Sequence, residues 1–597
     1  MRKCCVIALT LVSCVALAQG PAGPPAEGRG GAGAGGRGAA NQGRGGNRIP
    51  RRETFERLRS GVSSILGWRL GTSAKAFPHD TLDTAGAAAD AAEIMFIAGS
   101  SKQKINELVP KNLDAKLKPG EMQEVRDRLR HWVLNMPVYF TDAMDSDEQS
   151  LRKLFEFARD LRIETIVSER MPASLLPVEK LADEFKIKVA LTGDPKSLLS
   201  SLEGRGPSMG AFADVEAWMK QGVKPAEAVA QLKDRVLVVR LSDASLGGNA
   251  APAAQLLEEM YRLEIKPTMI IADTDATTDV RARVVRSVES LERAVQGPAA
   301  KQIAKVSKQI PIFSPDRLAP EVREKVLAAL PQQAAATPKK PRKLLVFDAN
   351  VGRAGPGRAT GHASMPAANL AVEEFAKKTG AFEAVFSNDI ENFKYEKLKQ
   401  FDAVFLNNNV GPTFVDPQVR EGLLRFVREG GGLAGYHAAS VISMDWPEFR
   451  TLLGAAGANH RAPTEVVTVK IDDPKSPLTA VFQGKGFEQA DEFYRFDTKS
   501  PTRDDVHVLM SFDVENTDMN QGENCPKFCV RANGDYPVSW IRREGKGRVF
   551  YTSMGHTPAF FMSKELNQFF FAALQFVLGD MEADTTPSNK LRVTSQR

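Results

Sequence analysis

The sequence predicts an α/β protein of two domains, an N-terminal (β/α)8-type barrel and a C-terminal doubly wound open sheet. Three observations predict this fold class. Short apolar runs alternate with amphipathic helical patterns through residues 60–297, which is the order of a parallel barrel. A run rich in proline, alanine and lysine near residue 335 then interrupts the pattern. From residue 342 a new alternation begins, in the order of a doubly wound sheet.

The first 18 residues have the pattern of a secretory signal peptide. Arg2 and Lys3 precede an apolar run, Cys4–Leu17, and Ala16-Leu17-Ala18 fits a small-residue cleavage site. We therefore expect a periplasmic or secreted protein. Leu11-Val12-Ser13-Cys14 also resembles a bacterial lipobox, so a lipid anchor at Cys14 is the alternative. The apolar run is too short for a membrane span, and we find no second candidate span.

Residues 19–59 form a segment rich in Gly, Arg and Pro that we expect to be disordered, because it has too little apolar surface to offset its ordering entropy. The net charge of +6 is concentrated there. The sequence shows no basic face interleaved with aromatic residues, so we expect no nucleic-acid partner. Only Cys525 and Cys529 follow the predicted signal peptide. In an exported protein such a pair favours a small disulfide clip, with free thiols as the alternative.

The predicted barrel occupies residues 60–297. A helix is expected over Asp147–Leu161, where apolar residues recur at intervals of three and four, and another over Ala251–Leu263. Residues 298–341 are expected to be a linker with one helical piece, Pro320–Leu330. The expected barrel strands are Trp68–Thr72, Ala92–Ile97, Val133–Phe140, Thr165–Ser168, Lys188–Leu191, Met209–Ala213, Arg235–Arg240 and Thr268–Ala272.

The second domain is expected over residues 342–580, followed by a disordered tail, 581–597. Its helices are expected at Pro366–Lys378, Pro417–Glu429 and Ser563–Leu578. Its first strands are expected at Lys343–Asp348, Phe382–Ser387, Ala403–Asn407 and Leu433–Tyr436. The later strands are expected to pair antiparallel, at Glu465–Ile471, His507–Phe512, Val538–Arg542 and Arg548–Thr552.

Histidines are concentrated in this second domain, which holds five of the seven in the chain. His507 begins a strand pattern and is expected to be structural. The other four follow apolar segments in loop-like contexts: His362, His437, His460 and His556. Because ligands of doubly wound sheets bind beyond the carboxyl ends of the strands, we expect these imidazoles to share one solvent-reachable cavity. Asp491 and Glu492 supply adjacent carboxylates.

His437 ends the strand Leu433–Tyr436, and a helix is expected to begin just after it. A helix N-terminus disfavours positive charge and would keep the imidazole neutral. A neutral imidazole can act as a general base or as a metal ligand.

The domain resembles the trehalose-utilisation (ThuA-like) family, whose fold is that of the class I glutamine amidotransferases, a flavodoxin-like sheet. The matching pieces are Gly361-His362, Gly430–Ser440, Met444-Asp445-Trp446-Pro447, Asn459-His460, Asp491–Tyr494, Gly545–Thr552 and Gly555-His556. Amidotransferases carry a nucleophilic cysteine where this sequence, like the family, has His437, which excludes thiol amidotransfer.

The resemblance implies a small-molecule carbohydrate as partner, a disaccharide or a keto-sugar. It implies acid–base chemistry by histidines and a carboxylate, or chemistry assisted by a divalent metal. The catalytic candidates are His437, His362, His556 and Glu492. The substrate-binding candidates are His460, Asp491, Tyr436 and Trp446.

The first domain resembles the xylose isomerase-like (sugar phosphate isomerase/epimerase) TIM barrels. The matching pieces are Trp68–Gly71, Pro110–Asp114, Phe155–Ala158, Ile163–Glu169 and Gly210–Asp214. The resemblance implies a divalent metal, for which Glu169 and Asp214 are the remaining ligands. The other expected ligands are replaced, by Ala217, Arg240, Asp273 and the segment Thr192-Gly193-Asp194. Two carboxylates do not hold a catalytic ion firmly, although Asp194 or Asp273 would be the residue to rebuild a site. We therefore expect an inactive barrel.

Two functions are compatible with the sequence. In the first, the C-terminal domain is an exported enzyme that acts on a disaccharide or keto-sugar. In the second, the chain is a non-catalytic sugar-binding or scaffold protein built from two degenerate sugar-enzyme domains. The convergence of the four histidines in one cleft would favour the first.

Overall fold

The structure is a computed structural model and describes residues 62–77, 81–145, 147–247, 251–352, 359–455, 457, 460–461, 464–496, 500–519 and 531–594. The predicted signal peptide with Cys14, the segment 19–59 and the pair Cys525–Cys529 lie outside the described residues. Their predicted roles stay predictions.

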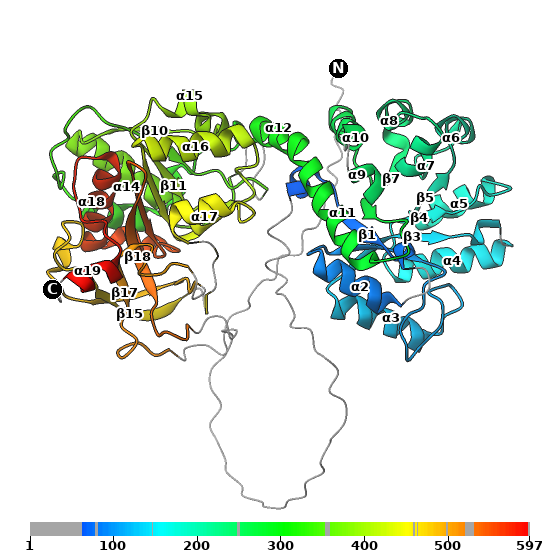
Figure 1. Ribbon diagram of the computed structural model, residues 1–597, viewed down its shortest axis with the longest axis horizontal. Coiled ribbons are helices and arrows are strands. Elements are labelled where there is room, and N and C mark those ends of the chain that lie inside the picture. The colour runs from blue at the N-terminus through cyan, green and yellow to red at the C-terminus, as the bar shows by residue number, and fades with distance from the viewer. Residues whose placement is uncertain are drawn as a thin grey trace, which may run out of the picture. The chain divides into compact units, whose positions relative to one another are not determined.

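The N-terminal domain is a closed barrel of parallel strands, which confirms the first half of the predicted fold class (Figure 1). Its interior is filled by apolar side chains from the strands, including Phe140, Phe212 and Ile271. The strands follow chain order around the barrel: β1 (Leu70–Ser73), β2 (Phe96–Ser100), β3 (Asn135–Thr141), β4 (Thr165–Ser168), β5 (Lys188–Thr192), β6 (Met209–Asp214), β7 (Val236–Ser242) and β8 (Met269–Asp273).

Helices surround this barrel and bury their apolar faces against the strands. In α4 (Glu148–Asp160) the side chain of Asp147 caps the first turn by accepting bonds from the N–H groups of Gln149 and Ser150. The other helices are α2 (Leu82–Ala91), α3 (Pro119–His131), α5 (Leu176–Phe185), α6 (Pro195–Leu202), α7 (Val215–Lys220), α8 (Pro225–Leu232), α9 (Asp243–Leu246), α10 (Ala251–Arg262) and α11 (Val280–Ala294).

The connector expected over 298–341 is more ordered than a linker. It opens with α12 (Gln296–Ser307), which buries Ile303, and it contains α13 (Pro320–Ala329) where a helical piece was expected. The backbone N–H of Phe313 then donates to Asp348 at the start of the second domain, over 2.9 Å. The prediction of a linker was wrong for 298–307, which belong to α12, because composition marks only the proline-rich end of this stretch.

The C-terminal domain is built on a mixed sheet of nine strands in the order β10-β9-β11-β13-β19-β18-β17-β15-β16. The first five of these are mutually parallel, and the last four continue the sheet in antiparallel fashion. The strands are β9 (Lys343–Phe347), β10 (Glu383–Phe386), β11 (Ala403–Asn407), β13 (Gly432–Tyr436), β15 (Glu465–Ile471), β16 (Phe487–Asp491), β17 (His507–Phe512), β18 (Pro537–Glu544) and β19 (Gly547–Thr552). One expectation is corrected: β19 pairs parallel with β13 and antiparallel with β18.

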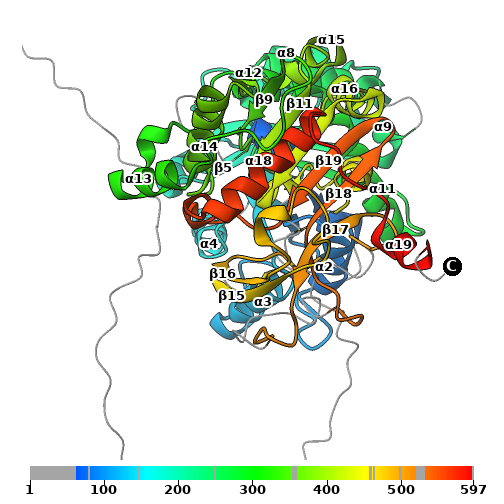
Figure 2. The same ribbon diagram turned by 90° about the vertical axis from the view of Figure 1, so that its left-hand side faces the viewer.

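Both faces of the parallel part are covered, as a doubly wound sheet requires. Along β9, Leu344 and Val346 pack in the core with α14 (Met365–Thr379) and α18 (Lys564–Leu578), whereas Leu345 and Phe347 pack in the core on the other face. Figure 2 shows α18 running along the sheet beside β19. The remaining helices are α15 (Tyr395–Leu398), α16 (Pro417–Glu429) and α17 (Pro447–Leu453).

The end of the chain was expected to be disordered from residue 581, and this is corrected. Residues 588–594 form the helix α19 (Ser588–Thr594), and the backbone of Ser588 donates to the carbonyl of Val506. His507 holds the same segment, through a contact of 2.7 Å between its Nδ1 and the carbonyl of Thr586. Among the described helices, none has the length and hydrophobicity that a membrane crossing needs.

Candidate functional site

Four parallel strands, β9, β11, β13 and β19, end at the same edge of the C-terminal sheet. The chain beyond each strand carries polar side chains. His362 lies between β9 and α14, His437 follows β13 directly, and His556 lies in the turn after β19. Asn407, Asn408 and Asn409 stand at the end of β11. The topology therefore brings residues from distant parts of the sequence to one place.

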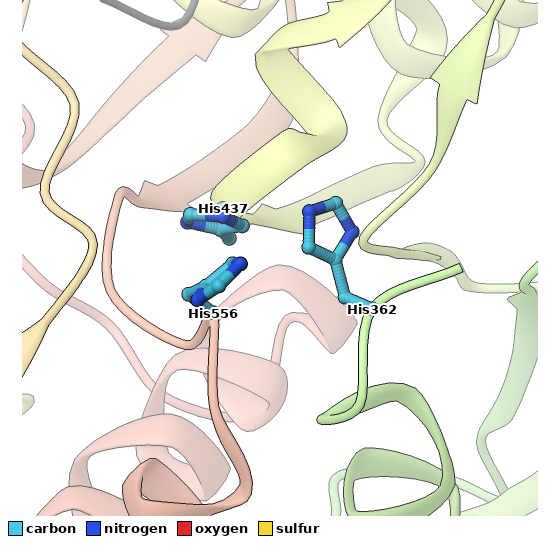
Figure 3. Close-up of side chains that lie close together, drawn as sticks. All are labelled: His362, His437 and His556. Carbon is cyan, nitrogen blue, oxygen red and sulfur yellow. The ribbon is translucent and has the colours of Figure 1, made fainter. Parts of the chain in front are cut away.

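Three of the predicted histidines converge. Figure 3 shows the rings of His362, His437 and His556 facing one another. The ring centroids form a nearly equilateral triangle, with separations of 5.0, 5.1 and 5.2 Å. One nitrogen of each ring lies within 4.8 Å of the others, and within the described residues this is the one group of His, Cys, Asp and Glu side chains arranged closely enough to hold a metal ion.

The conformation of His437 differs from the prediction in two respects. The residue begins a single 3-10 turn, His437–Ser440, and not an α-helix, so a helix dipole does not act on its imidazole. Its side chain is fully buried, although an exposed elbow was expected. Its backbone has a φ of +46°, a strained conformation for a residue with a side chain. This strained turn aims the ring at the other two histidines.

The tautomer of His437 follows from its partners. Its Nδ1 lies 2.9 Å from the carbonyl oxygen of Ser553, which can only accept, so Nδ1 carries the hydrogen. With the hydrogen on Nδ1, Nε2 is the acceptor of a hydrogen bond from the hydroxyl of Tyr494 over 3.0 Å. A carbonyl that fixes one nitrogen so that the other can bind is the usual support of a histidine ligand.

Glu492 lies beside the triangle. Its carboxylate is 3.4 Å from His437 Nε2, 3.4 Å from His460 Nδ1 and 3.8 Å from His556 Nε2. Burial alone would raise the pKa of Glu492, but the neighbouring imidazoles of His437, His460 and His556 hold that pKa below its usual value. Glu492 is therefore ionised at neutral pH.

His460 is the fourth predicted histidine and the most exposed of those around Glu492. Its side chain is 32% exposed, against 26% for His556 and 0% for His437. Burial lowers the pKa of His460, against the opposing effect of Glu492, so its imidazole is neutral at pH 7. The cluster thus meets solvent on the side of His460 and His556.

Three other predicted residues do not face the cluster. Asp491 is fully buried and accepts from the backbone N–H groups of Gly555 (2.6 Å) and Glu492 (3.0 Å), so it fixes the backbone next to two site residues. Tyr436 is also fully buried, with its hydroxyl 2.8 Å from Asn407 Oδ1. Trp446 packs against Phe414 and Phe449, among other core rings. The surroundings of Tyr436 and Trp446 do not favour the expected contact with a sugar.

Tyr494 and Asn408 were not given roles in the sequence. Tyr494 belongs to the segment Asp491–Tyr494, which matches the family. A tyrosine two residues after the candidate Glu492 was the signal that could have identified it. Asn408 is the middle of three consecutive asparagines that follow a buried strand. Such a polar run at the carboxyl end of a strand is the signal that could have identified it.

In the barrel, both predicted metal ligands form ion pairs with basic side chains. Glu169 forms ion pairs with Lys75 (2.8 Å) and Lys102 (3.3 Å). Asp214 pairs with Arg240 (3.2 Å), the residue that stands where the resemblance implies a histidine ligand. Within the described residues, Glu169 and Asp214 belong to no group that could hold a metal ion. The residues present do not fit the ion that the barrel resemblance implies.

The C-terminal domain is thus a doubly wound α/β domain with a cluster of histidines and one carboxylate at the carboxyl edge of its sheet. Residues 355–577 match the model of the ThuA family, described as trehalose utilisation. This part of the chain is a ThuA domain, as the sequence indicated, and the description of its family indicates a function related to carbohydrates.

Solved structures similar to each domain are known. A ThuA-like protein from Bacteroides uniformis is 25% identical, with a TM-score of 0.33, and the match covers 40% of this chain and 92% of that one. A xylose isomerase-like TIM barrel protein from Mycobacterium smegmatis, in complex with magnesium, is 11% identical, with a TM-score of 0.32, covering 39% of this chain and 99% of that one. A sugar phosphate isomerase/epimerase from Parabacteroides distasonis is 10% identical, with a TM-score of 0.30, covering 40% and 95%. No curated protein matches the sequence significantly.

Proposed function

We propose that the ThuA domain is an exported carbohydrate-processing enzyme that acts on a disaccharide or keto-sugar. The site of the reaction is the cluster of His362, His437, His556 and Glu492. The observation that carries the proposal is the triangle of imidazoles, whose ring centroids are 5.0–5.2 Å apart, with an ionised carboxylate beside it.

We further propose that the three imidazoles hold a divalent metal ion. Neutral imidazoles suit zinc and other borderline transition metals better than magnesium. Three histidines leave a coordination position open for substrate, as catalytic sites require. A metal ion there supplies Lewis acidity, which polarises a carbonyl or hydroxyl oxygen of a sugar.

The residues around the triangle supply the proton transfer. Glu492 is ionised and lies within 3.4 Å of the His437 and His460 rings, so it can take a proton from a sugar hydroxyl or from water. His460, neutral and partly exposed, can accept that proton from Glu492 and pass it to solvent. The Tyr494 hydroxyl bonds to His437 Nε2 in this structure, so a metal ion at that nitrogen would displace it.

For the barrel we propose a supporting role without turnover. Lys75, Lys102 and Arg240 place fixed positive charges against Glu169 and Asp214, where the resemblance implies a metal ion. This arrangement favours a non-catalytic scaffold role, but only for the first domain.

The test uses the full-length protein and its His437→Ala variant. Titration with Co²⁺ or Zn²⁺, followed by calorimetry and by the absorption of bound Co²⁺, should show one site in the wild type and none in the variant. A set of 3-keto-disaccharides and their parent sugars is then tested with and without a chelator. Turnover is expected to disappear in His437→Ala while circular dichroism is unchanged. Equal turnover in both proteins would rule out this site.

A further inference from the structure

The three histidine-bearing loops share one hydrogen-bonding partner that is not itself a histidine. The side chain of Asn408 is fully buried behind the cluster. Its Nδ2 donates to the hydroxyl of Ser364 over 3.0 Å and to the carbonyl of Gly555 over 3.4 Å. Its Oδ1 accepts from the backbone N–H of Ala438 over 3.0 Å.

Each of these contacts is next to one of the histidines. Ser364 is two residues after His362, Ala438 directly follows His437, and Gly555 directly precedes His556. One amide thus connects the loops after β9, β13 and β19 from its own position after β11. We infer that Asn408 is the positioning residue of the cluster, which sets the distances between the three imidazoles.

The chemistry of this position requires an amide. Two of the partners accept, the Ser364 hydroxyl and the Gly555 carbonyl, and the third, the Ala438 N–H, donates. A carboxylate would offer no hydrogen for the first two, and an apolar side chain would leave buried polar groups unpaired. Asn408 also has a φ of +58°, in the left-handed region that asparagine tolerates better than most residues with a side chain.

The inference deepens the proposed function and rests on it for the role of the histidines. The first test substitution is Asn408→Gly, because glycine accepts the left-handed backbone while the change removes all three side-chain hydrogen bonds. The matched control is Asn409→Ala. Asn409 is also fully buried, is adjacent, and donates a single bond of 2.9 Å to the carbonyl of Ala349.

The measurement that does not depend on metal is amide hydrogen exchange of full-length protein, read in peptides covering 359–364, 437–442 and 553–557. We expect exchange to accelerate in all three loops together in Asn408→Gly, and in none of them in Asn409→Ala. Acceleration in one loop only, or equal acceleration in the control, would overturn the inference.

Metal affinity provides the second measurement. Loss of a residue that supports metal ligands typically weakens binding by about 10–100-fold. We expect Co²⁺ affinity to fall within that range in Asn408→Gly, with a changed absorption spectrum of bound Co²⁺, and to stay unchanged in Asn409→Ala. If wild-type protein binds no Co²⁺, the proposed metal site fails, while the exchange experiment still decides the role of Asn408.

A third variant covers the case in which Asn408→Gly does not fold. Asn408→Asp keeps the acceptor for the Ala438 N–H and loses both donors. The Ser364 hydroxyl can turn its hydrogen toward the new carboxylate, whereas the Gly555 carbonyl cannot donate. Exchange should then accelerate at 553–557 while 437–442 remains protected. Uniform protection of all three loops in this variant would contradict the inference.

Discussion

Gly555 occupies a position where a side chain has no space. Its φ is +106°, and a Cβ there would lie 2.5 Å from the ring of Tyr436, which is itself fully buried. Since Gly555 directly precedes His556, any displacement is passed to a member of the triangle. Gly555 N–H also donates to Asp491, which fixes the turn from the other side.

We expect Gly555→Ala to destabilise the C-terminal domain by about 2–5 kcal/mol through overpacking and left-handed strain. It should also weaken metal binding, because His556 moves. The control is Gly534→Ala, where φ is +64° but no atom lies within 4 Å of the added Cβ. Calorimetric unfolding and Co²⁺ titration of both variants make the comparison. Equal losses of affinity would show that strain alone, and not the contact with Tyr436, is responsible.

At this scale the sequence identified the residue types but not their arrangement. His362, His437 and His556 were predicted and lie together, because they follow recognisable strands. Glu492 was predicted as one of two adjacent carboxylates, although the strand before it was not. The burial of His437 was not predictable, since it depends on loops packed from distant segments. Tyr436 is buried because it ends the central strand β13 and packs against Phe405 and Phe570. Asn408 was not identified because the run of three asparagines after a buried strand does not show which side chain bonds to the neighbouring loops.

The segment that carries Glu492 and Tyr494 is held in place by a buried ion pair. Arg495 follows it, and its guanidinium pairs with Glu465, the first residue of β15. Both side chains are about 1% exposed, the contact is bidentate, and Nη2 lies 2.6 Å from Oε2. The guanidinium also lies over the ring of Phe512. The pair therefore holds the segment after β16 against the first residue of the neighbouring strand β15.

Removing one partner leaves the other charge buried and unpaired. We expect Arg495→Met to lower the free energy of unfolding by about 3–5 kcal/mol. The double variant Glu465→Met, Arg495→Met should recover much of that stability. Calorimetric unfolding is the measurement, and the control is Arg543→Met. The partly exposed pair of Arg543 with Glu582 is expected to contribute at most about 1 kcal/mol. A double variant no more stable than Arg495→Met would contradict this account.

Regular elements were the most predictable level of this structure. The strand β4 and the helix α16 begin and end where the sequence placed them, because each has clear boundaries. In α16, Asp416 caps the first turn and Gly430 ends the helix. The strand β16 was missed since its alternating pattern is partly exposed, and α12 was missed because it lies in a stretch read as linker.

The whole molecule combines two α/β domains whose sites differ in their charge. In the ThuA domain, imidazoles surround a carboxylate, and three of them are close enough together to hold a metal ion. In the barrel, lysine and arginine side chains already neutralise the carboxylates at the ends of the strands. Arg240 contacts Asp273 (2.9 Å), Asp214 (3.2 Å) and Asp275. This difference supports assigning the proposed chemistry to the second domain.

Arg240→Met tests whether this guanidinium is a structural replacement for an ion. Asp273 is about 1% exposed, and burial raises its pKa to about 6 even with Arg240 beside it. Without Arg240 that pKa rises further above the unfolded value of about 4. The folded variant then binds the proton of Asp273 more tightly than the unfolded chain does. Its stability therefore falls as the pH rises from about 5 to 8.

We expect Arg240→Met to lower the free energy of unfolding of the barrel by about 3–5 kcal/mol at pH 8. At pH 5 the decrease should be smaller, because Asp273 can remain protonated. Calorimetric unfolding of wild type and variant at the two pH values is the measurement. Arg283→Met is the control, since the pair of Arg283 with Asp243 is partly exposed and should contribute little at either pH. The opposite trend, a larger loss at pH 5, would show that Asp273 is not the group left uncompensated.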